Sequence, residues 1–167
     1  VGDNVRLFNI HNYIANYRIG HDTCIENVNA IIVDGPTCFG NGVRVPVMNE
    51  GGGREIPIFD SLSASLAYIL TLYRHRPQMI KQLELKIDAY AASLSSEVGE
   101  IGHHVRIINC GSIKNVKIGE YAELIGVSRL KNGSVNSNAL APIRMGSGVK
   151  CTDFIISSGV SIGDSTL

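Results

Sequence analysis

The chain has 167 residues, of which 44% are hydrophobic and 18% are charged, and its 15 basic residues balance 15 acidic ones. This length and composition are typical of a folded domain with a sizeable core, and they exclude a disordered chain. The neutral charge balance and the absence of nucleic-acid-binding motifs argue against a nucleic-acid partner. No stretch approaches about 18 consecutive apolar residues, and the first residues lack the order of a signal peptide, so we expect a cytoplasmic protein without a membrane partner.

The cysteines and the chain ends add two further expectations. No CxxC pattern occurs, which argues against a zinc knuckle or a redox pair. We expect reduced, partly buried thiols at Cys24, Cys38, Cys110 and Cys151. The chain begins without a methionine and stops within a repeat, so we expect it to be a piece of a longer protein.

Residues 1–48 introduce a five-residue word that recurs along the chain. Its first residue is apolar, its second is glycine and its fifth is Val, Ala or Thr. Copies of the word begin at Val1, Ile19, Phe39, Ile101, Ile118, Met145 and Ile162. We expect these first residues to form one inward-facing column and the small fifth residues to fit a narrow interior. The glycines are expected to adopt a backbone conformation that a side chain would penalise.

Apolar residues in the first part of the chain also recur every six positions. They are Val1, Leu7, Tyr13, Ile19, Ile25 and Ile31. This period differs from the 3.6 residues of an α-helix and from the 2 residues of a β-strand. It suits a short strand followed by a corner, with three strands in each triangular coil. Stacked coils pair their strands in parallel, so the period predicts a parallel β-helix of roughly six to seven coils.

The segment MNEGGGREIPIFD follows the first coils and contains the candidate ligand site. Three successive glycines can direct backbone N–H groups towards one anion, and an arginine and two glutamates flank them. The candidate ligand-binding residues are Asn49, Glu50, Gly51, Gly52, Gly53, Arg54 and Glu55. The segment matches no Walker or dinucleotide-binding motif, so a flexible joint at which the chain leaves the coils is the alternative interpretation.

Residues 60–97 have helical spacing. Apolar side chains recur at helical intervals in two runs, which are Leu62, Leu66, Ile69, Leu70 and Tyr73, then Ile80, Leu83, Ile87, Tyr90 and Leu94. We expect Asp60 to cap the first helix and Pro77 to occupy the first turn of the second, with a break near Arg76. The pattern predicts a helical hairpin that packs on the coils or on another subunit, and a single kinked helix is the alternative.

Residues 98–167 return to the repeated word. One polar stretch, KNGSVNSNALAP from Lys131 to Pro142, interrupts it and is expected to be a loop. We therefore expect one mainly β domain in three stretches. Residues 1–48 form the first part of the β-helix, residues 49–97 form the Gly-rich loop and the inserted hairpin, and residues 98–167 form the second part of the β-helix.

The word [LIV]-G-x-x-[STAV]-x, repeated in threes, resembles the bacterial transferase hexapeptide repeat from Val1 to about Val47 and from Val98 to Leu167. The order of the inserts is similar to that of uncharacterised long members with a helical insert. The resemblance implies a left-handed parallel β-helix of hexapeptide repeats. It also implies an acyltransferase that uses acetyl-CoA or another acyl-CoA, and a homo-oligomer, with a trimer as the family habit.

Acyltransferases of this kind use a histidine as general base, because a neutral imidazole has a pKa near the working pH. The candidate catalytic residues are His11, His21 and His103. His21 and His103 follow an Ile-Gly pair at an expected corner, and His11 lies among aromatic and amide side chains. A zinc-binding class of the same fold has two histidines five residues apart. That spacing is absent here, so no metal is expected.

Two functions from different classes follow from these observations. The leading one is a hexapeptide-repeat acyltransferase-like domain in sugar or nucleotide-sugar metabolism, which binds a phosphorylated or nucleotide-sugar small molecule near the Gly-rich loop. The alternative is a non-catalytic β-helix scaffold or oligomerisation domain of a larger protein. A fold does not decide between them.

Overall fold

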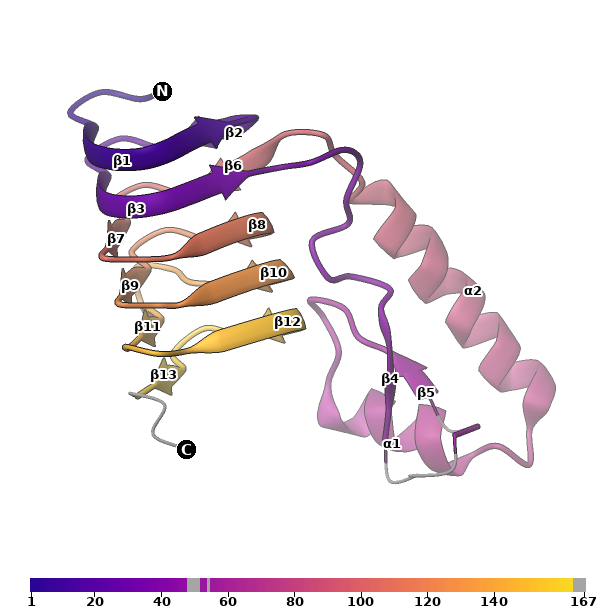
Figure 1. Cartoon of the computed structure of the whole chain (residues 1–167). Coiled ribbons are helices and arrows are strands. Elements are labelled where there is room, and N and C mark those ends of the chain that lie inside the picture. Colours follow the sequence, from indigo (N-terminus) through magenta and orange to yellow (C-terminus); the bar gives the residue numbers. More distant parts are fainter. Residues whose placement is uncertain (48–51, 54, 164–167) are drawn as a thin grey trace.

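The computed structural model describes residues 1–47, 52–53 and 55–163. Figure 1 shows a stack of strands with a smaller part beside it, made of two helices and a short β-hairpin. We call this smaller part, residues 34–98, the insert. The chain leaves the stack after its third strand and returns from the second helix.

The described residues of the stack form one sheet of eleven strands, and every strand pair in it is parallel. Its strands are β1 (Arg6–Ala15), β2 (Tyr17–Ile19), β3 (Cys24–Ile32), β6 (Gly99–Ile101), β7 (Arg106–Ile108), β8 (Ser112–Ile118), β9 (Glu123–Ile125), β10 (Arg129–Val135), β11 (Arg144–Met145), β12 (Lys150–Ile156) and β13 (Ser161–Ile162). Their order is β12-β10-β8-β3-β7-β9-β11-β13, with β1 on β3 and with β6 between β2 and β8. The expected mainly β, parallel architecture is confirmed at this level.

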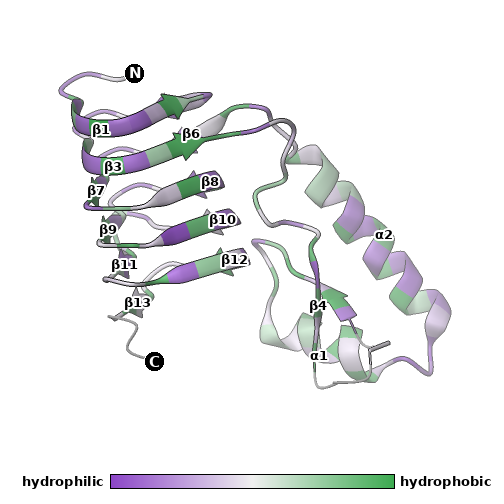
Figure 2. Cartoon of the chain, in the orientation of Figure 1, coloured by the Kyte–Doolittle hydropathy of each residue, from purple (hydrophilic) through white to green (hydrophobic). Residues whose placement is uncertain are grey.

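The strand register aligns apolar side chains in three columns. The first column contains Ile19, Ile101, Ile118, Val135 and Ile156. The second contains Leu7, Ile25, Ile107, Leu124, Met145 and Ile162, and the third contains Ile14, Ile31, Ile113, Leu130 and Cys151. Most of these side chains are fully buried, and each such burial contributes roughly 1.5–3 kcal/mol. Figure 2 shows hydrophobic and hydrophilic residues alternating along the stacked strands.

The expectation of a single column for all seven words is wrong. Met145 and Ile162 lie in the second column, and Val1 is 83% exposed. Phe39 is buried, but it leaves the stack and covers the outer side of β10. In the stack the word lies where a strand ends, because its first residue is the last residue of β2, β6, β8, β11 and β13. It therefore marks such a position without specifying which column follows.

Gly20 and Gly102 of the word are required by backbone packing and not by an unusual backbone conformation, whereas Gly40 adopts the expected conformation that a side chain would penalise, with φ 84°. Gly20 and Gly102 do not have positive φ angles. A Cβ on Gly20 would lie 2.6 Å from the carbonyl carbon of Gly102, and one on Gly102 would lie 2.6 Å from the backbone nitrogen of Glu120. The fifth residues of these words behave as expected, because Thr23, Val105 and Ala122 are buried.

Among the described residues other than glycine, positive φ angles occur mainly at asparagine and aspartate. Among the described residues, Asn4, Asn9, Asn16, Asp22, Asn27, Asn109, Asn115, Asn132 and Asp153 have φ between 51° and 59°. Asn and Asp tolerate this region better than other residues with a side chain because their short polar groups bond locally. They also form ladders between levels, as where the Asn9 amide donates to Asn27 (3.1 Å) and the Asn27 amide donates to Asn109 (2.6 Å). Several of these residues lie inside the longer strands, as Asn9 does in β1 and Asn27 in β3, where they let the chain turn within the strand.

The insert contains β4 (Arg44–Pro46), β5 (Glu55–Pro57), α1 (Ala64–Leu72) and α2 (Pro77–Ser93). The helical hairpin and the proline in the first turn of α2 are confirmed, and a single kinked helix is wrong. The cap of α1 is Ser63, whose hydroxyl accepts from the backbone N–H of Leu66 at 3.2 Å. The prediction of Asp60 as this cap is wrong, because its carboxylate instead accepts from Asn136 of the stack.

The insert has a hydrophobic core of its own. Ile56, Phe59, Leu70 and Ile87 are buried together, and half-buried residues of β4, α1 and α2 surround them. The antiparallel pair β4–β5, which was not predicted from the sequence, supplies one side of this core. Arg44 ties β4 to α2 through Glu84 (3.1 Å) and Asp88 (3.4 Å).

The polar stretch from Lys131 to Pro142 is only partly a loop. Its first five residues belong to β10, which pairs with both β8 and β12. Leu130 and Val135 occupy the apolar columns while Lys131 points outward, so the polar composition reflects exposure of one face. The expectation of a loop across this whole stretch is therefore wrong.

Neither helix is long and apolar enough to span a membrane, as judged on the residues that the structure describes.

Candidate functional site

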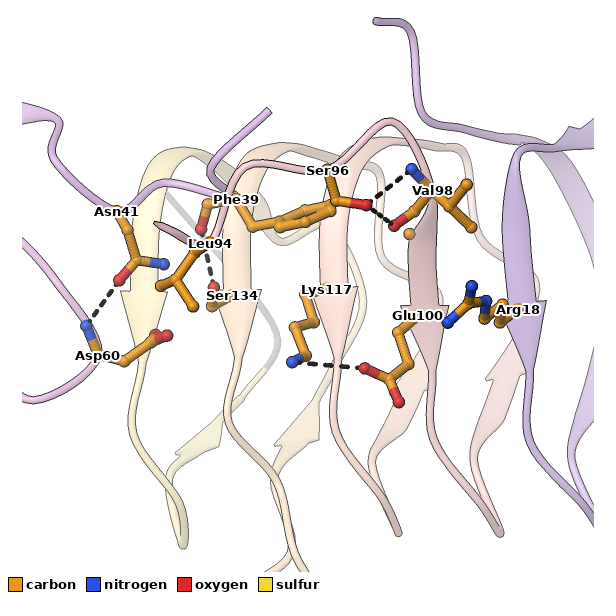
Figure 3. A pocket seen from close by; sticks show the side chains of 11 residues that line it. Arg18, Phe39, Asn41, Asp60, Leu94, Ser96, Val98, Glu100, Lys117 and Ser134 are labelled. Carbon is orange, nitrogen blue, oxygen red and sulfur yellow. Dashed lines mark hydrogen bonds and ion pairs between the residues drawn. The ribbon is translucent and has the colours of Figure 1, made fainter. Parts of the chain in front are cut away.

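A cavity of about 180 Å³ lies where the insert leaves and rejoins the stack (Figure 3). Its floor is the outer side of the stack, with Arg18, Glu100, Lys117 and Ser134. Its walls come from the outgoing and returning segments of the insert, with Phe39, Asn41, Asp60, Leu94, Ser96 and Val98. We call this cavity the junction pocket.

The floor of the junction pocket is one outward-facing column. Each floor residue immediately precedes a residue of the first apolar column, so its side chain points to the opposite face of the strand. Arg18 lies beside Glu100 in the register, and Glu100 lies beside Lys117. Charges therefore alternate along the floor. The Lys117 ammonium and the Glu100 carboxylate are 3.4 Å apart, and both side chains are about half exposed.

The outgoing wall is fixed to the stack by polar contacts. The buried Ser134 hydroxyl donates to the carbonyl of Phe39 at 2.8 Å. The Asn41 amide oxygen accepts from the backbone N–H of Asp60 at 2.9 Å. The Asp60 carboxylate accepts from the Asn136 amide at 2.8 Å, and Figure 3 shows this carboxylate facing the cavity. These bonds hold a carboxylate at one end of the pocket.

The returning wall is held by the two ends of the insert. Thr37 and Ser96 exchange two backbone hydrogen bonds of 3.0 Å each. The Ser96 hydroxyl donates to the carbonyl of Val98 at 2.8 Å and accepts from its N–H at 3.0 Å. The polar groups of this wall are thus satisfied within the wall, and Leu94 and Val98 add apolar surface to the pocket.

A partly buried tyrosine, Tyr17, supports the floor. The Tyr17 hydroxyl donates to the carbonyl of Val116 at 2.8 Å and accepts from its N–H at 3.2 Å. Burial raises the pKa of Tyr17 above its ordinary value, so the phenol remains neutral. Its ring covers Gly99, where a side chain would collide with it. Tyr17 therefore holds β2 and β6, which carry Arg18 and Glu100, against β8.

Arg18 differs from the other charged residues of the pocket. Among the residues that the structure describes, no side chain or carbonyl forms a hydrogen bond or ion pair with its guanidinium. Figure 3 places it at the end of the floor opposite Asp60. The pocket thus offers a cation at one end and a carboxylate at the other.

The predicted catalytic histidines lie outside the junction pocket. His21 and His103 are brought together on neighbouring levels, where their rings stack with centroids 4.9 Å apart. The Nδ1 atom of His21 accepts from the backbone N–H of Asp3 (2.8 Å), and that of His103 accepts from the backbone N–H of His21 (2.9 Å). Accepting these bonds requires an unprotonated Nδ1, so both rings serve to link levels. His11 is exposed and contacts the Asn27 amide oxygen at 2.8 Å.

The predicted glycine-rich ligand site is only partly visible. Asn49, Glu50, Gly51 and Arg54 lie outside the described residues. The Gly53 N–H donates to both carboxylate oxygens of Glu55, at 2.9 and 3.0 Å. The backbone N–H of Glu55 itself and then that of Gly53 hold the pKa of this carboxyl below its ordinary value. The chain thus places its own carboxylate on a donor that was expected to bind a ligand.

The described residues contain no group of three or more His, Cys, Asp or Glu side chains arranged to hold a metal ion. The junction pocket is lined by neither histidine nor cysteine among the described residues. Its lining offers hydrogen-bonding groups and charged groups of both signs.

The floor residues were not predicted from the sequence, because the candidate histidines lie after the aliphatic-glycine pairs and the floor residues lie before them. A usable signal was present one position earlier. Arg18, Glu100 and Lys117 all directly precede an Ile-Gly pair. Ile19, Ile101 and Ile118 share the first apolar column, so the charges before them lie together, but the Ile-Gly pair at Ile162 lies in the second column. The pattern therefore groups the three charges only once the columns are known. The walls carry no such signal, since they depend on where the insert folds back.

Comparison with known proteins gives a family but no activity. An "Uncharacterized protein" of Treponema pallidum (strain Nichols) is 26% identical over 173 residues, covering 97% of this chain and 24% of that protein. The chain therefore spans about a quarter of the length of this curated relative. No solved structure matches the chain significantly.

The family match corrects the resemblance drawn from the repeated word. Assignment to the bacterial transferase hexapeptide-repeat superfamily is wrong, because the family that matches is a different one and covers every residue. The repeated word reflects close backbone packing between stacked levels. Any parallel stack with such close packing requires it. Residues 1–167 match DUF4954, described as a domain of unknown function, and the chain belongs to this family.

Proposed function

We propose that this chain is a non-catalytic β-helical scaffold domain that binds a small polar molecule in the junction pocket. In this proposal the strands of the stack close into three-sided, left-handed coils. The stack supplies a rigid floor of charged side chains, and the insert supplies the walls. A site built on strands holds its side chains more precisely than one built on loops.

Three observations support closed coils. The apolar columns number three, and the residues Ile19, Ile25 and Ile31 of successive columns are six positions apart. The strands β8, β10 and β12 keep one register along their length, and Figure 1 shows them nearly aligned. The usual right-handed preference of parallel connections comes from strand twist, so nearly aligned strands weaken that preference and permit a left hand. A crystal structure of the chain tests both closure and hand.

One observation carries the binding function. The pocket has a floor of alternating charges, and it is lined by segments that are far apart in the sequence, at residues 18, 39–41, 60, 94–100, 117 and 134. Pockets with convergent polar groups on a rigid scaffold are the usual binding sites of small molecules. A scaffold that only assembles does not require such a pocket.

The test fills the pocket and asks whether binding is lost. Val98 lines the pocket and is 41% exposed, while Val160 is 38% exposed and lies outside the lining. We expect ligand-observed NMR with separate sets of neutral sugars, organic acids, phosphate esters and amines to find at least one set that binds the 167-residue chain. Val98→Trp should abolish that binding and Val160→Trp should preserve it. Binding by no set, or binding that survives Val98→Trp, contradicts the proposal and favours a scaffold alone.

Acyl transfer from acetyl-CoA and assembly into a trimer stay predictions. The described pocket places neither a histidine nor a cysteine beside a bound acceptor. Mixing the chain with acetyl-CoA and a sugar or amine acceptor and measuring release of the CoA thiol tests the first, and sedimentation equilibrium tests the second.

A further inference from the structure

We infer that the ligand of the junction pocket is a small polyhydroxylated acid, with one carboxylate or phosphate held by Arg18 and its hydroxyl groups held by Asp60 and Glu100. This inference rests on the proposed binding function and specifies the chemical class of the ligand. It follows from the charge, the size and the hydrogen-bonding capacity of the pocket.

Arg18 forms one end of the charged floor. The Lys117 ammonium is paired with Glu100, whereas the guanidinium of Arg18 has no partner among the described residues. A guanidinium presents donors in a planar fork that matches a carboxylate or a phosphate. An anionic group of the ligand therefore completes the alternation of charges along the floor.

The volume of the junction pocket limits the size of its ligand. The cavity measures about 180 Å³, which is below the roughly 300–1,000 Å³ of pockets that enclose drug-sized ligands. A molecule with a single ring fits this space. A complete nucleotide-sugar, expected from the sequence, does not fit inside the cavity, so only one end of such a molecule can enter.

The hydrogen-bonding groups of the lining indicate which groups the ligand carries besides its anion. The Asp60 carboxylate faces the cavity while Asn136 occupies one of its oxygens, and the Glu100 carboxylate lines the floor. Carboxylates accept hydrogen bonds from hydroxyl groups. The apolar surface of Leu94 and Val98 suits the C–H face of a ring. A compact ring that carries hydroxyl groups can donate hydrogen bonds to the two carboxylates and place its C–H face on the two apolar side chains.

The experiment compares four probes of nearly equal size by isothermal titration calorimetry. They are glucuronate, glucose 6-phosphate, neutral glucose and glucosamine. We expect glucuronate or glucose 6-phosphate to bind the 167-residue chain at least tenfold more tightly than glucose, and glucosamine to bind no better than glucose. Which of the two acids binds more tightly identifies the carboxylate or the phosphate as the recognised group. Added salt should weaken the binding of the acids.

Two arginine variants attribute the preference to one side chain. Arg18→Ala should reduce acid binding at least tenfold and bring it to the level of glucose, with no change in Tm. Arg129→Ala is the matched control, because Arg129 is an exposed arginine of the stack outside the pocket. It should leave binding unchanged.

The outcomes separate this inference from the proposed function. If glucose or glucosamine binds as well as the acids, and Val98→Trp abolishes that binding, the pocket binds small molecules but the inferred anion preference is wrong. If acid binding is unaffected by Arg18→Ala, the inferred role of Arg18 is wrong. If no probe binds, the inference is wrong, and the broader sets of compounds decide whether the pocket binds anything.

Discussion

Glycine at the second position of the repeated word keeps two backbones at van der Waals distance. The Cβ of an alanine at Gly102 would lie 2.6 Å from a backbone atom of Glu120, which cannot rotate away. We expect Gly102→Ala to lower the free energy of unfolding by roughly 1–3 kcal/mol, the usual cost of overpacking. Chemical denaturation measures this loss.

The matched control for this variant is Gly163→Ala. No atom lies within 4 Å of a Cβ at Gly163, and its φ is not positive. Its stability should therefore remain within about 0.5 kcal/mol of the unsubstituted chain. Equal losses in the two variants would contradict the packing explanation.

A substitution at Ile118 tests the first apolar column. Ile118 is fully buried between Ile101 and Val135, so Ile118→Asp places a carboxylate where no cation can reach it. We expect a loss of at least ~3 kcal/mol, seen as a large drop in the midpoint of urea unfolding. Ile125→Asp is the control, because Ile125 is 37% exposed on β9 and its carboxylate stays in water. A wild-type midpoint for Ile118→Asp would refute the column.

At the scale of elements, an ion pair links the end of β3 to β8. The Lys114 ammonium donates to the Asp34 carboxylate at 2.6 Å. This hydrogen bond, followed by the charge of Lys114, holds the pKa of Asp34 below its ordinary value of 3.8. Because the folded-state pKa is depressed, the pair stabilises the fold above pH 3.8, and this contribution is lost as the pH falls through the lower folded-state pKa.

The corresponding prediction is that Lys114→Ala raises the pKa of Asp34 towards 3.8. An NMR titration of the Asp34 carboxyl carbon measures it. Lys131→Ala removes the cation directly opposite Lys114 on β10, which does not donate to Asp34, and should leave the titration nearly unchanged. Equal shifts in both variants would show that general charge, and not the bond between the two elements, sets this pKa.

At the scale of the whole molecule, the stack is continuous across the insert. Strands β2 and β6 pair directly, although the paired residues Ile19 and Ile101 are 82 positions apart in the sequence. Thr37 and Ser96 form a hydrogen-bonded pair near the two ends of the insert, and the insert has a separate core. The stack therefore does not need the insert to complete its apolar columns.

We expect a chain in which a short Gly-Ser linker replaces residues 38–95 to fold, with a β-type circular dichroism spectrum and a cooperative thermal transition. The Tm should fall modestly because Ser134 loses the cover of Phe39. Binding in the junction pocket should disappear together with its walls. The same linker placed at the exposed Leu140 controls for added chain entropy. An unfolded product would show that the insert is part of one cooperative unit with the stack.

The parallel stack, its six-residue period and the two helices were determined by the sequence itself. Each of these depends on residues that are close in the chain or repeat at a fixed interval. The apolar period places Ile19, Ile25 and Ile31 in the core, and Pro77 begins a helix wherever that helix packs. Local sterics and repeated burial require no knowledge of the rest of the fold, so these predictions hold.

Only the tertiary structure shows three other features. They are the column that each repeated word joins, the pairing of β4 with β5, and the junction pocket. Asp60 illustrates the reason. Its sequence context suits a helix cap, yet its carboxylate bonds to Asn136, 76 positions away, because the insert folds back onto the stack there. Long-range contacts of this kind depend on how separate elements pack. For the same reason His21 and His103, which are prominent in the sequence, link levels of the stack, while Arg18 faces a cavity that exists only after the insert has folded.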